Sequence, residues 1–227
     1  MIRLTWMMMA AAVVLSGEAL KVKQAARDVA PSADPKSAFW RDVAPLFATA
    51  DNLGKELPDN RTEIRVRWTE RNFYVLMVCP YKEMYVLPNP KVKEETNKLW
   101  ERDVAEVFLG GDFEKIHQYK EYQLSPQGEW VDLDIDNKQP LPEGGWKWNS
   151  GMLTKARIDA AAKVWYGEFR IPLAGVTAKK VAAGMKLRGN FYRFQGGPTP
   201  RQMVAWRPTG RISNHTPEKF GELELVK

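Results

Sequence analysis

Short runs in which apolar and polar residues alternate recur along the chain from Phe39 onward. Residues 62–68 place an apolar side chain at every second position from Ile64, which is the period of a half-buried strand. A tight turn at 70–72 and an apolar run at 73–79 complete a predicted hairpin. Further strands are expected at 103–109, 119–124, 130–135, 152–159, 164–171, 186–194 and 222–226.

Turn-forming residues separate these runs at short spacing, and no long stretch repeats with the period of a helix. The pattern predicts an all-β fold, an antiparallel immunoglobulin-like β-sandwich that resembles a jelly roll. At most one or two short helices are expected, one of them within 173–183. The 227 residues, 44% of them hydrophobic, suffice for one packed core.

The N-terminal residues have the order of a signal peptide. Arg3 precedes a short apolar stretch, and small residues follow up to Ala19. We therefore expect a signal peptide at 1–19, a polar, alanine-rich linker at 20–36 and one domain at 37–227.

The apolar stretch is shorter than the roughly 20 residues that cross a bilayer. No membrane span is therefore expected in the mature chain, and the expected location is the periplasm or the exterior. The alternatives are an uncleaved anchor or a wrongly assigned start site.

The charge pattern argues against nucleic acid as a partner. The net charge is +6, but Lys and Arg are scattered among Asp and Glu without a basic run of five. The single cysteine, Cys79, excludes a disulfide within the chain and sits in an apolar run, so we expect it to be buried. Nine tryptophans are more unusual, because Trp fills cores but also stacks on flat apolar ligand faces.

Residues that carry catalysis are not evident. The sequence has no nucleophile elbow, phosphate-binding loop or dinucleotide fingerprint, so we expect no catalytic residues and no enzyme activity. Asp132, Asp134 and Asp136 share one face of a predicted strand and are a weak candidate for calcium. The alternative is a solvated polar face and no cofactor.

The most specific signal is the segment 99–109, in which an aromatic residue precedes a strand that reads Asp-x-x-Glu-Val-Phe. This segment resembles the signature of family 9 carbohydrate-binding modules. Four further motifs follow in the family's order, so the likeness runs from about Phe39 to the C-terminus. They are Tyr119-x-Glu121 with Ser125-Pro126-x-Gly128 and Asp132, Trp165-x-x-Glu168-x-x-Ile171-Pro172, Gly189-Asn190-Phe191-Tyr192-Arg193 with Ala205-Trp206-x-Pro208-Thr209, and His215-x-Pro217-Glu218-x-Phe220-Gly221.

The resemblance implies a non-catalytic module that binds a mono- or oligosaccharide, or a polysaccharide end, between two aromatic rings. Trp100 matches the first ring, Glu106 an acid and Asn190 an amide of the family's site. The second ring falls near position 193, where this chain has Arg193. The aromatic sandwich is then incomplete unless Trp206 or Tyr192 substitutes for the second ring. An arginine can also stack on a sugar or donate to a carboxylate, which makes an acidic sugar conceivable.

Two further residues of the matching hairpin, Tyr119 and Glu121, complete the predicted site. Each polar candidate also has a structural interpretation. An acid in mid-strand such as Glu106 or Glu121 can be paired with Arg or Lys, and Asn190 can belong to a turn or bulge. Trp100 can simply cover the core.

Two other functions remain open from the sequence. Related DOMON-like sandwiches bind haem b between a Met and a His, for which Met84 or Met77 with His215 or His117 are candidates. Alternatively, the domain keeps the fold for protein interaction and has lost the sugar site, an interpretation that Arg193 favours.

Overall fold

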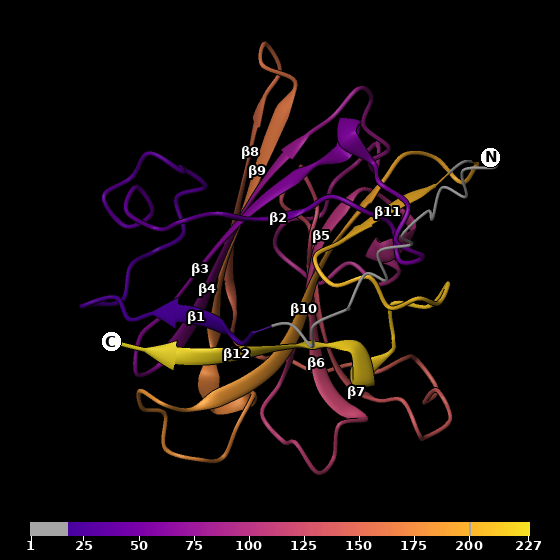
Figure 1. The fold of residues 1–227 in the computed structure, drawn as a ribbon. Coiled ribbons are helices and arrows are strands. Elements are labelled where there is room, and N and C mark those ends of the chain that lie inside the picture. Colours follow the sequence, from indigo (N-terminus) through magenta and orange to yellow (C-terminus); the bar gives the residue numbers. More distant parts are fainter. Residues whose placement is uncertain (1–17, 200) are drawn as a thin grey trace, which may run out of the picture.

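The computed structural model describes residues 18–199 and 201–227, which form a β-sandwich of two sheets (Figure 1). Sheet A has seven strands, and β11 (Gln202–Ala205) pairs with β10 beside the main path. The spatial order of the others is β1 (Leu20–Lys23), β12 (Gly221–Val226), β10 (Lys186–Gln195), β5 (Val104–Gly110), β6 (Gln118–Leu124) and β7 (Trp130–Asp136). Sheet B contains β2 (Leu46–Ala48), β3 (Thr62–Trp68), β4 (Asn72–Pro80), β9 (Val164–Pro172) and β8 (Leu153–Asp159).

Antiparallel pairing dominates both sheets, and β1 with β12 is a parallel pair. Burial alternates along β3 at every second residue, as its sequence predicts, and β4 returns from a turn with Trp68 opposite Phe73. The antiparallel all-β sandwich and the nine predicted strands are thus confirmed. The helical content of the described residues is four 3-10 turns: η1 (Pro58–Asn60), η2 (Leu99–Glu101), η3 (Leu173–Gly175) and η4 (Pro217–Lys219).

The central core lies between the sheets. Val107 of β5 belongs to the same buried cluster as Val75 of β4 and Phe169 of β9. Cys79 is fully buried in this cluster, as predicted. A second cluster covers the outer face of sheet A, because alternate residues such as Phe108 point away from the sandwich. Sheet A therefore has apolar side chains on both faces, and its outer face carries the candidate site.

The predicted linker at 20–36 is wrong, because these residues are built into the domain. Residues 20–23 form β1, and the segment 27–43, here called the N-terminal strap, crosses the outer face of sheet B. The buried Glu168 carboxylate accepts hydrogen bonds from the backbone N–H groups of Ser32 and Ala33, at 2.8 and 2.7 Å. The contacts that hold the strap come from residues far away in the sequence. Its local composition is polar, so the sequence alone resembles that of a linker.

Other expectations near the chain ends and loops have mixed outcomes. The helix expected within 173–183 is reduced to the single turn η3, and β2 and β11 were not predicted. The predicted signal peptide falls almost entirely on residues outside the described part of the chain. Within the described part, no helix has the length and apolar character needed to cross a membrane.

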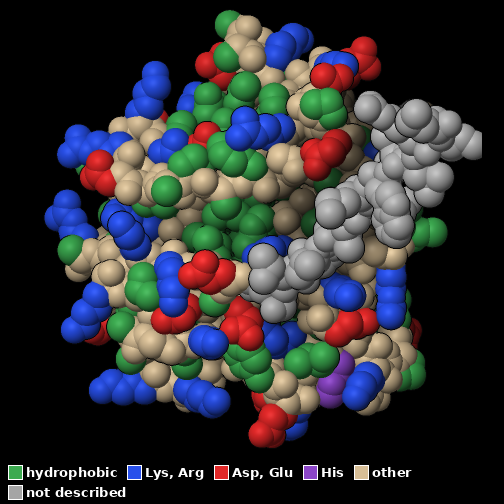
Figure 2. All heavy atoms as spheres, viewed as in Figure 1, with side chains coloured by type: hydrophobic (Ala, Val, Ile, Leu, Met, Phe, Trp, Pro, Cys, Tyr) green, Lys and Arg blue, Asp and Glu red, His purple; other side chains and the backbone are tan. Residues whose placement is uncertain are grey.

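The surface charge is mixed. On the face shown in Figure 2, Lys and Arg side chains are scattered among Asp and Glu and do not form one continuous basic patch. This distribution agrees with the scattered pattern of charges in the sequence.

Candidate functional site

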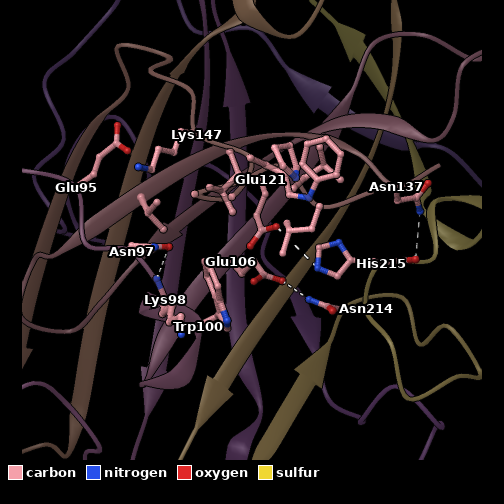
Figure 3. Close-up of a pocket in the computed structure, with 18 of the residues that line it drawn as sticks. Glu95, Asn97, Lys98, Trp100, Glu106, Glu121, Asn137, Lys147, Asn214 and His215 are labelled. Atoms are coloured by element: carbon pink, nitrogen blue, oxygen red, sulfur yellow. Dashed lines mark hydrogen bonds and ion pairs between the residues drawn. The ribbon is translucent and has the colours of Figure 1, made fainter. Parts of the chain in front are cut away.

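A pocket of about 920 Å³ lies on the outer face of sheet A. The strands supply its floor, and loops at 95–100, 137–147 and 214–215 supply its walls. The side chains on this face come from alternate strand positions, which place Glu106 of β5 opposite Gln123 of β6 and Glu121 of β6 opposite Phe108 of β5. The two acids are therefore diagonal neighbours on adjacent strands (Figure 3).

Three half-buried aromatic side chains line the pocket: Trp100, Trp146 and Phe194. Trp100 sits in the middle of η2, whose first residue, Leu99, is buried in the outer cluster. This anchor fixes the turn and leaves the indole of Trp100 on the pocket wall. The remaining lining includes apolar floor residues and polar rim residues, namely Val131, Leu133, Ile135, Leu141, Pro142, Glu95, Asn97, Lys98, Asn137, Gln139, Gly144, Gly145, Lys147, Asn214 and His215.

Glu106 and Glu121 form a buried carboxyl pair, with 1% and 3% of their surfaces exposed. The Gln123 amide donates to both, at 2.7 Å to Glu106 and 2.6 Å to Glu121, and the Asn214 amide donates to Glu106 at 2.6 Å. Burial raises the pKa of Glu106 to about 7. Burial and then the nearby Glu106 charge raise the pKa of Glu121 well above its ordinary value. At neutral pH the pair therefore holds a proton, and Glu121 is its preferred site.

His215 closes one side of the pocket. Its Nδ1 lies 2.7 Å from the Tyr119 hydroxyl, and its Nε2 lies 4.0 Å from Glu121. Burial lowers the pKa of His215, so the ring is neutral at pH 7. Burial raises the pKa of Tyr119 far above its ordinary value, so the phenol keeps its proton. Tyr119 therefore donates to Nδ1, and Nε2 carries the ring hydrogen that faces Glu121.

The domain model described as carbohydrate family 9 binding domain-like matches residues 36–227. The chain belongs to this family. It is also 20% identical over 195 residues to endo-1,4-beta-xylanase A of Thermotoga neapolitana. That alignment covers 83% of this chain and 16% of the xylanase, so the chain spans a small part of its relative's length.

Solved structures show the same fold as this family 9-like domain. A family 9 carbohydrate-binding module of Caldicellulosiruptor kristjanssonii in complex with cellotriose matches with a TM-score of 0.64 at 15% identity, over 92% of this chain and 94% of that one. The same organism's module in complex with glucose matches with a TM-score of 0.62 at 14% identity, over 90% and 95% of the two chains. A candidate carbohydrate-binding protein from Bacteroides uniformis matches with a TM-score of 0.73 at 16% identity, over 92% and 100%.

The family 9-like domain brings together three of the residues that the sequence predicted for the site, since Trp100, Glu106 and Glu121 all line the pocket. Tyr119 lies beneath it, buried and bonded to His215. Neither acid is paired with Lys or Arg by a salt bridge within the described residues, so the interpretation of these acids as ion-paired structural residues is wrong.

Asn190 supports the site from below. It is fully buried, and its amide donates to the Tyr192 hydroxyl at 2.6 Å and to the Arg207 carbonyl at 2.8 Å. The Tyr192 hydroxyl in turn donates to the Asn214 carbonyl at 3.2 Å. Asn190 thus positions the loop that carries Asn214, instead of lining the pocket.

Arg193 and Trp206 lie away from the pocket, which corrects their predicted place in it. Arg193 points between the sheets, 1% exposed, and donates to the Pro80 carbonyl at 2.5 Å and to the Gln195 side chain. Trp206 packs on Phe191 of the central core. For Arg193 the reason is strand parity. Residue 193 lies on the opposite face of β10 from residue 190, whereas Phe194 lies on the same face as residue 190.

The sequence analysis did not identify four residues of the site. Trp146, Phe194 and Asn214 line the pocket, and Gln123 donates hydrogen bonds to both acids. Parity along β10 could have identified Phe194, because Asn190 was already assigned to the site. Trp146 and Asn214 sit in long loops whose paths depend on tertiary contacts, and they give no local signal. His215, which belongs to the last of the family motifs, lines the pocket and forms a hydrogen bond with Tyr119.

The weak calcium candidate has a different environment. Asp132, Asp134 and Asp136 share one face as expected, but each has its own partner, respectively Ser150, Lys120 and Gln118. Among the described residues, no group of three or more His, Cys, Asp or Glu side chains is arranged to hold a metal ion. A calcium requirement stays a prediction.

The candidate haem ligands are not brought together in the sandwich. Met77 belongs to the cluster between the sheets, and Met84 packs against that cluster. His215 packs on Phe108 on the outer face of sheet A, with ring centroids 5.2 Å apart. His117 lies near Asp136, 3.8 Å from its carboxylate.

Proposed function

We propose that this chain binds the end of a carbohydrate in the pocket on the outer face of sheet A and performs no chemistry on it. The observation that carries the proposal is the combination of half-buried rings, Trp100, Trp146 and Phe194, with a floor of buried polar groups. A pyranose has an apolar face of C–H groups that suits an aromatic ring and a rim of hydroxyls that suits carboxylates and amides. Family membership supports the same function.

The arrangement of the acids supports binding over hydrolysis. Glycoside hydrolysis uses two carboxyl groups on either side of the scissile bond, with about 5 Å or more between them. Glu106 and Glu121 instead accept hydrogen bonds from one nitrogen of Gln123, side by side beneath the ligand space. A sugar cannot lie between them, so we infer a binding role for both.

We further propose that the mature protein acts in the periplasm or outside the cell. The order of charged, apolar and small residues up to Ala19 supports export, and β1 starts at the next residue, Leu20. Cleavage after Ala19 would leave every strand of the sandwich intact.

Calorimetric titration of residues 20–227 with glucose, cellobiose, xylobiose and a uronic acid, with and without calcium, tests the proposal. Trp100→Ala should weaken binding at least about ten-fold, because an aromatic face that covers a ligand contributes about 1.5–3 kcal/mol. Trp148→Ala is the matched control, since Trp148 follows Trp146 by two residues but packs on Tyr122 and outside the pocket. A folded, colourless protein that gives no heat with any sugar would favour the interaction-domain alternative.

A further inference from the structure

We infer that the pocket floor selects its sugar by charge: it favours a hexosamine, whose ammonium group would face Glu106 and Glu121, and it disfavours a uronic acid. The inference rests on the proposed carbohydrate binding and names the class of sugar. It replaces the acidic sugar that Arg193 suggested, because Arg193 lies between the sheets and not in the pocket.

Within residues 18–199 and 201–227, no Lys or Arg forms an ion pair with Glu106 or Glu121. Among the described residues, the group nearest to an ion pair with either acid is His215, 4.0 Å from Glu121, and its ring is neutral. Arg201 acts on Glu106 at longer range, but its guanidinium donates to the backbone carbonyls of Trp100 and Arg102. A buried carboxylate without a partner is costly, and an ammonium ion is the ligand group that relieves this cost.

The floor also has more hydrogen-bond acceptors than donors. Four carboxyl oxygens of Glu106 and Glu121 meet the amide nitrogens of Gln123 and Asn214. The Gln123 carbonyl oxygen is buried and has no partner within the described part of the chain. An ammonium group brings three donors, a hydroxyl brings one, and a carboxylate brings none. The acceptor-rich floor therefore ranks amino sugar above neutral sugar above uronate.

The other charged and titratable groups do not reverse this order. Lys98 and Lys147 line the pocket but are exposed, and Figure 3 shows them with Glu95 on the side away from His215. Exposed charges are screened by solvent and salt, so these two lysines attract an anion weakly. The buried phenols of Tyr119 and Tyr192 keep their protons, because burial raises the pKa of both, and the cation that acts on Tyr119 is Arg188.

The inference predicts a proton count as well as an affinity order. The pair holds a proton near neutral pH, because burial raises the pKa values of Glu106 and Glu121. An ammonium ion stabilises the ionised pair, so binding of a hexosamine should release a proton to the buffer. Binding of a neutral sugar should release fewer protons, and a uronate should require proton uptake.

Titration calorimetry at about pH 7, in buffers of different ionisation enthalpy, tests both the affinity order and the number of protons released. Each series compares an amino sugar, its neutral parent and its uronic acid: glucosamine, glucose and glucuronic acid, then galactosamine, galactose and galacturonic acid. We expect the amino sugar of one series to bind about ten-fold tighter than its parent, the gain of a charge-assisted over a neutral hydrogen bond. The uronic acid should bind more weakly than the parent, and N-acetylglucosamine should behave as a neutral sugar.

Two variants separate the floor charge from general effects. Glu121→Gln keeps the shape and should reduce both the preference for the amino sugar and the proton release, because Glu106 is then the one acid of the pair that can ionise. Glu143→Gln removes an equal charge from an exposed loop residue outside the pocket lining and should keep the preference.

The outcomes distinguish this inference from the proposed function. Neutral sugars that bind while amino sugars bind no tighter would overturn the inference and leave the proposed function standing. An amino-sugar preference that is undiminished in Glu121→Gln would also overturn the inference. A folded protein that binds no member of either series would overturn both.

Discussion

The hydroxyl of Tyr119 lies 2.7 Å from Nδ1 of His215, and this contact fixes which ring nitrogen carries the hydrogen. Nε2–H then points toward Glu121 at the pocket floor. Tyr119→Phe keeps the ring that packs on Phe108 and Phe220 but removes the donor. We expect the imidazole of the variant to populate both tautomers and sugar affinity to fall severalfold. Nitrogen-15 NMR of His215 reports the tautomer; an unchanged Nε2–H signal in the variant would contradict the assignment.

The carboxyl pair should make stability fall as pH rises. Burial raises the pKa of Glu106 from 4.5 to about 7, so between these values the folded state binds more protons than the unfolded state. The contribution of the pair to stability is complete below about pH 4.5 and is lost as pH rises through 7. Glu121→Gln mimics the protonated acid, so its stability relative to the native chain should increase with pH.

Urea unfolding at about pH 5 and pH 8 measures this difference. The difference in unfolding free energy between Glu121→Gln and the native chain should shift in favour of the variant by more than about 1 kcal/mol from about pH 5 to pH 8. This shift corresponds to about one pKa unit. The free energy of unfolding of the exposed control Glu143→Gln should change with pH in the same way as that of the native chain. Parallel curves for Glu121→Gln would show that Glu121 is ionised in the folded protein.

Arg193 should matter for stability and not for sugar binding. Its guanidinium donates to the Pro80 carbonyl and the Gln195 side chain between the sheets. Arg193→Met leaves these acceptors without a donor, which should cost about 1–3 kcal/mol in unfolding free energy. Calorimetry should give the native affinity for the preferred sugar. A changed sugar preference would place Arg193 in recognition after all.

Phe194 should be the second ring of the site. Phe194→Ala removes one aromatic wall and should weaken sugar binding by about ten-fold, similar to Trp100→Ala. Phe113→Ala is a suitable control, because Phe113 is 43% exposed and lies outside this pocket. Equal affinities of the native chain and Phe194→Ala would assign the second ring to Trp146.

The Glu168 carboxylate should be a main attachment of the strap to sheet B, beside the Arg65 and Arg157 side chains, which donate to strap carbonyls. Glu168 accepts two backbone hydrogen bonds and one hydroxyl hydrogen bond from Ser32 and Ala33. Glu168→Ala should lower the unfolding free energy by about 3 kcal/mol and speed amide exchange at Ser32 and Ala33. Sugar affinity should not change, since the pocket lies on the other sheet. Glu70→Ala, at an exposed turn, should leave exchange at both amides slow.

The sequence predicted the strands whose pattern is local. Alternation along 62–68 required no partner to be recognised, whereas β1 and β11, four residues each, exist because they pair with β12 and β10. The same distinction applies to the site. Trp100, Glu106 and Glu121 follow from motifs on or beside strands, but Trp146 and Asn214 reach the pocket through loops. Position 193 failed as a site residue for a reason visible in the sequence, because it has the wrong parity relative to Asn190.

The parallel pairing of β1 with β12 limits where the proposed export signal can be cut from the chain. The four residues Leu20–Lys23 satisfy the outer edge of the C-terminal strand, from Leu223 to Val226. A chain trimmed beyond Lys23 would expose that edge as a row of free N–H and C=O groups, ready to pair with a strand of another molecule. A cut after Ala19 keeps this edge of β12 covered. A cut after Lys23 would remove β1 and promote association between copies of the domain through the unpaired edge.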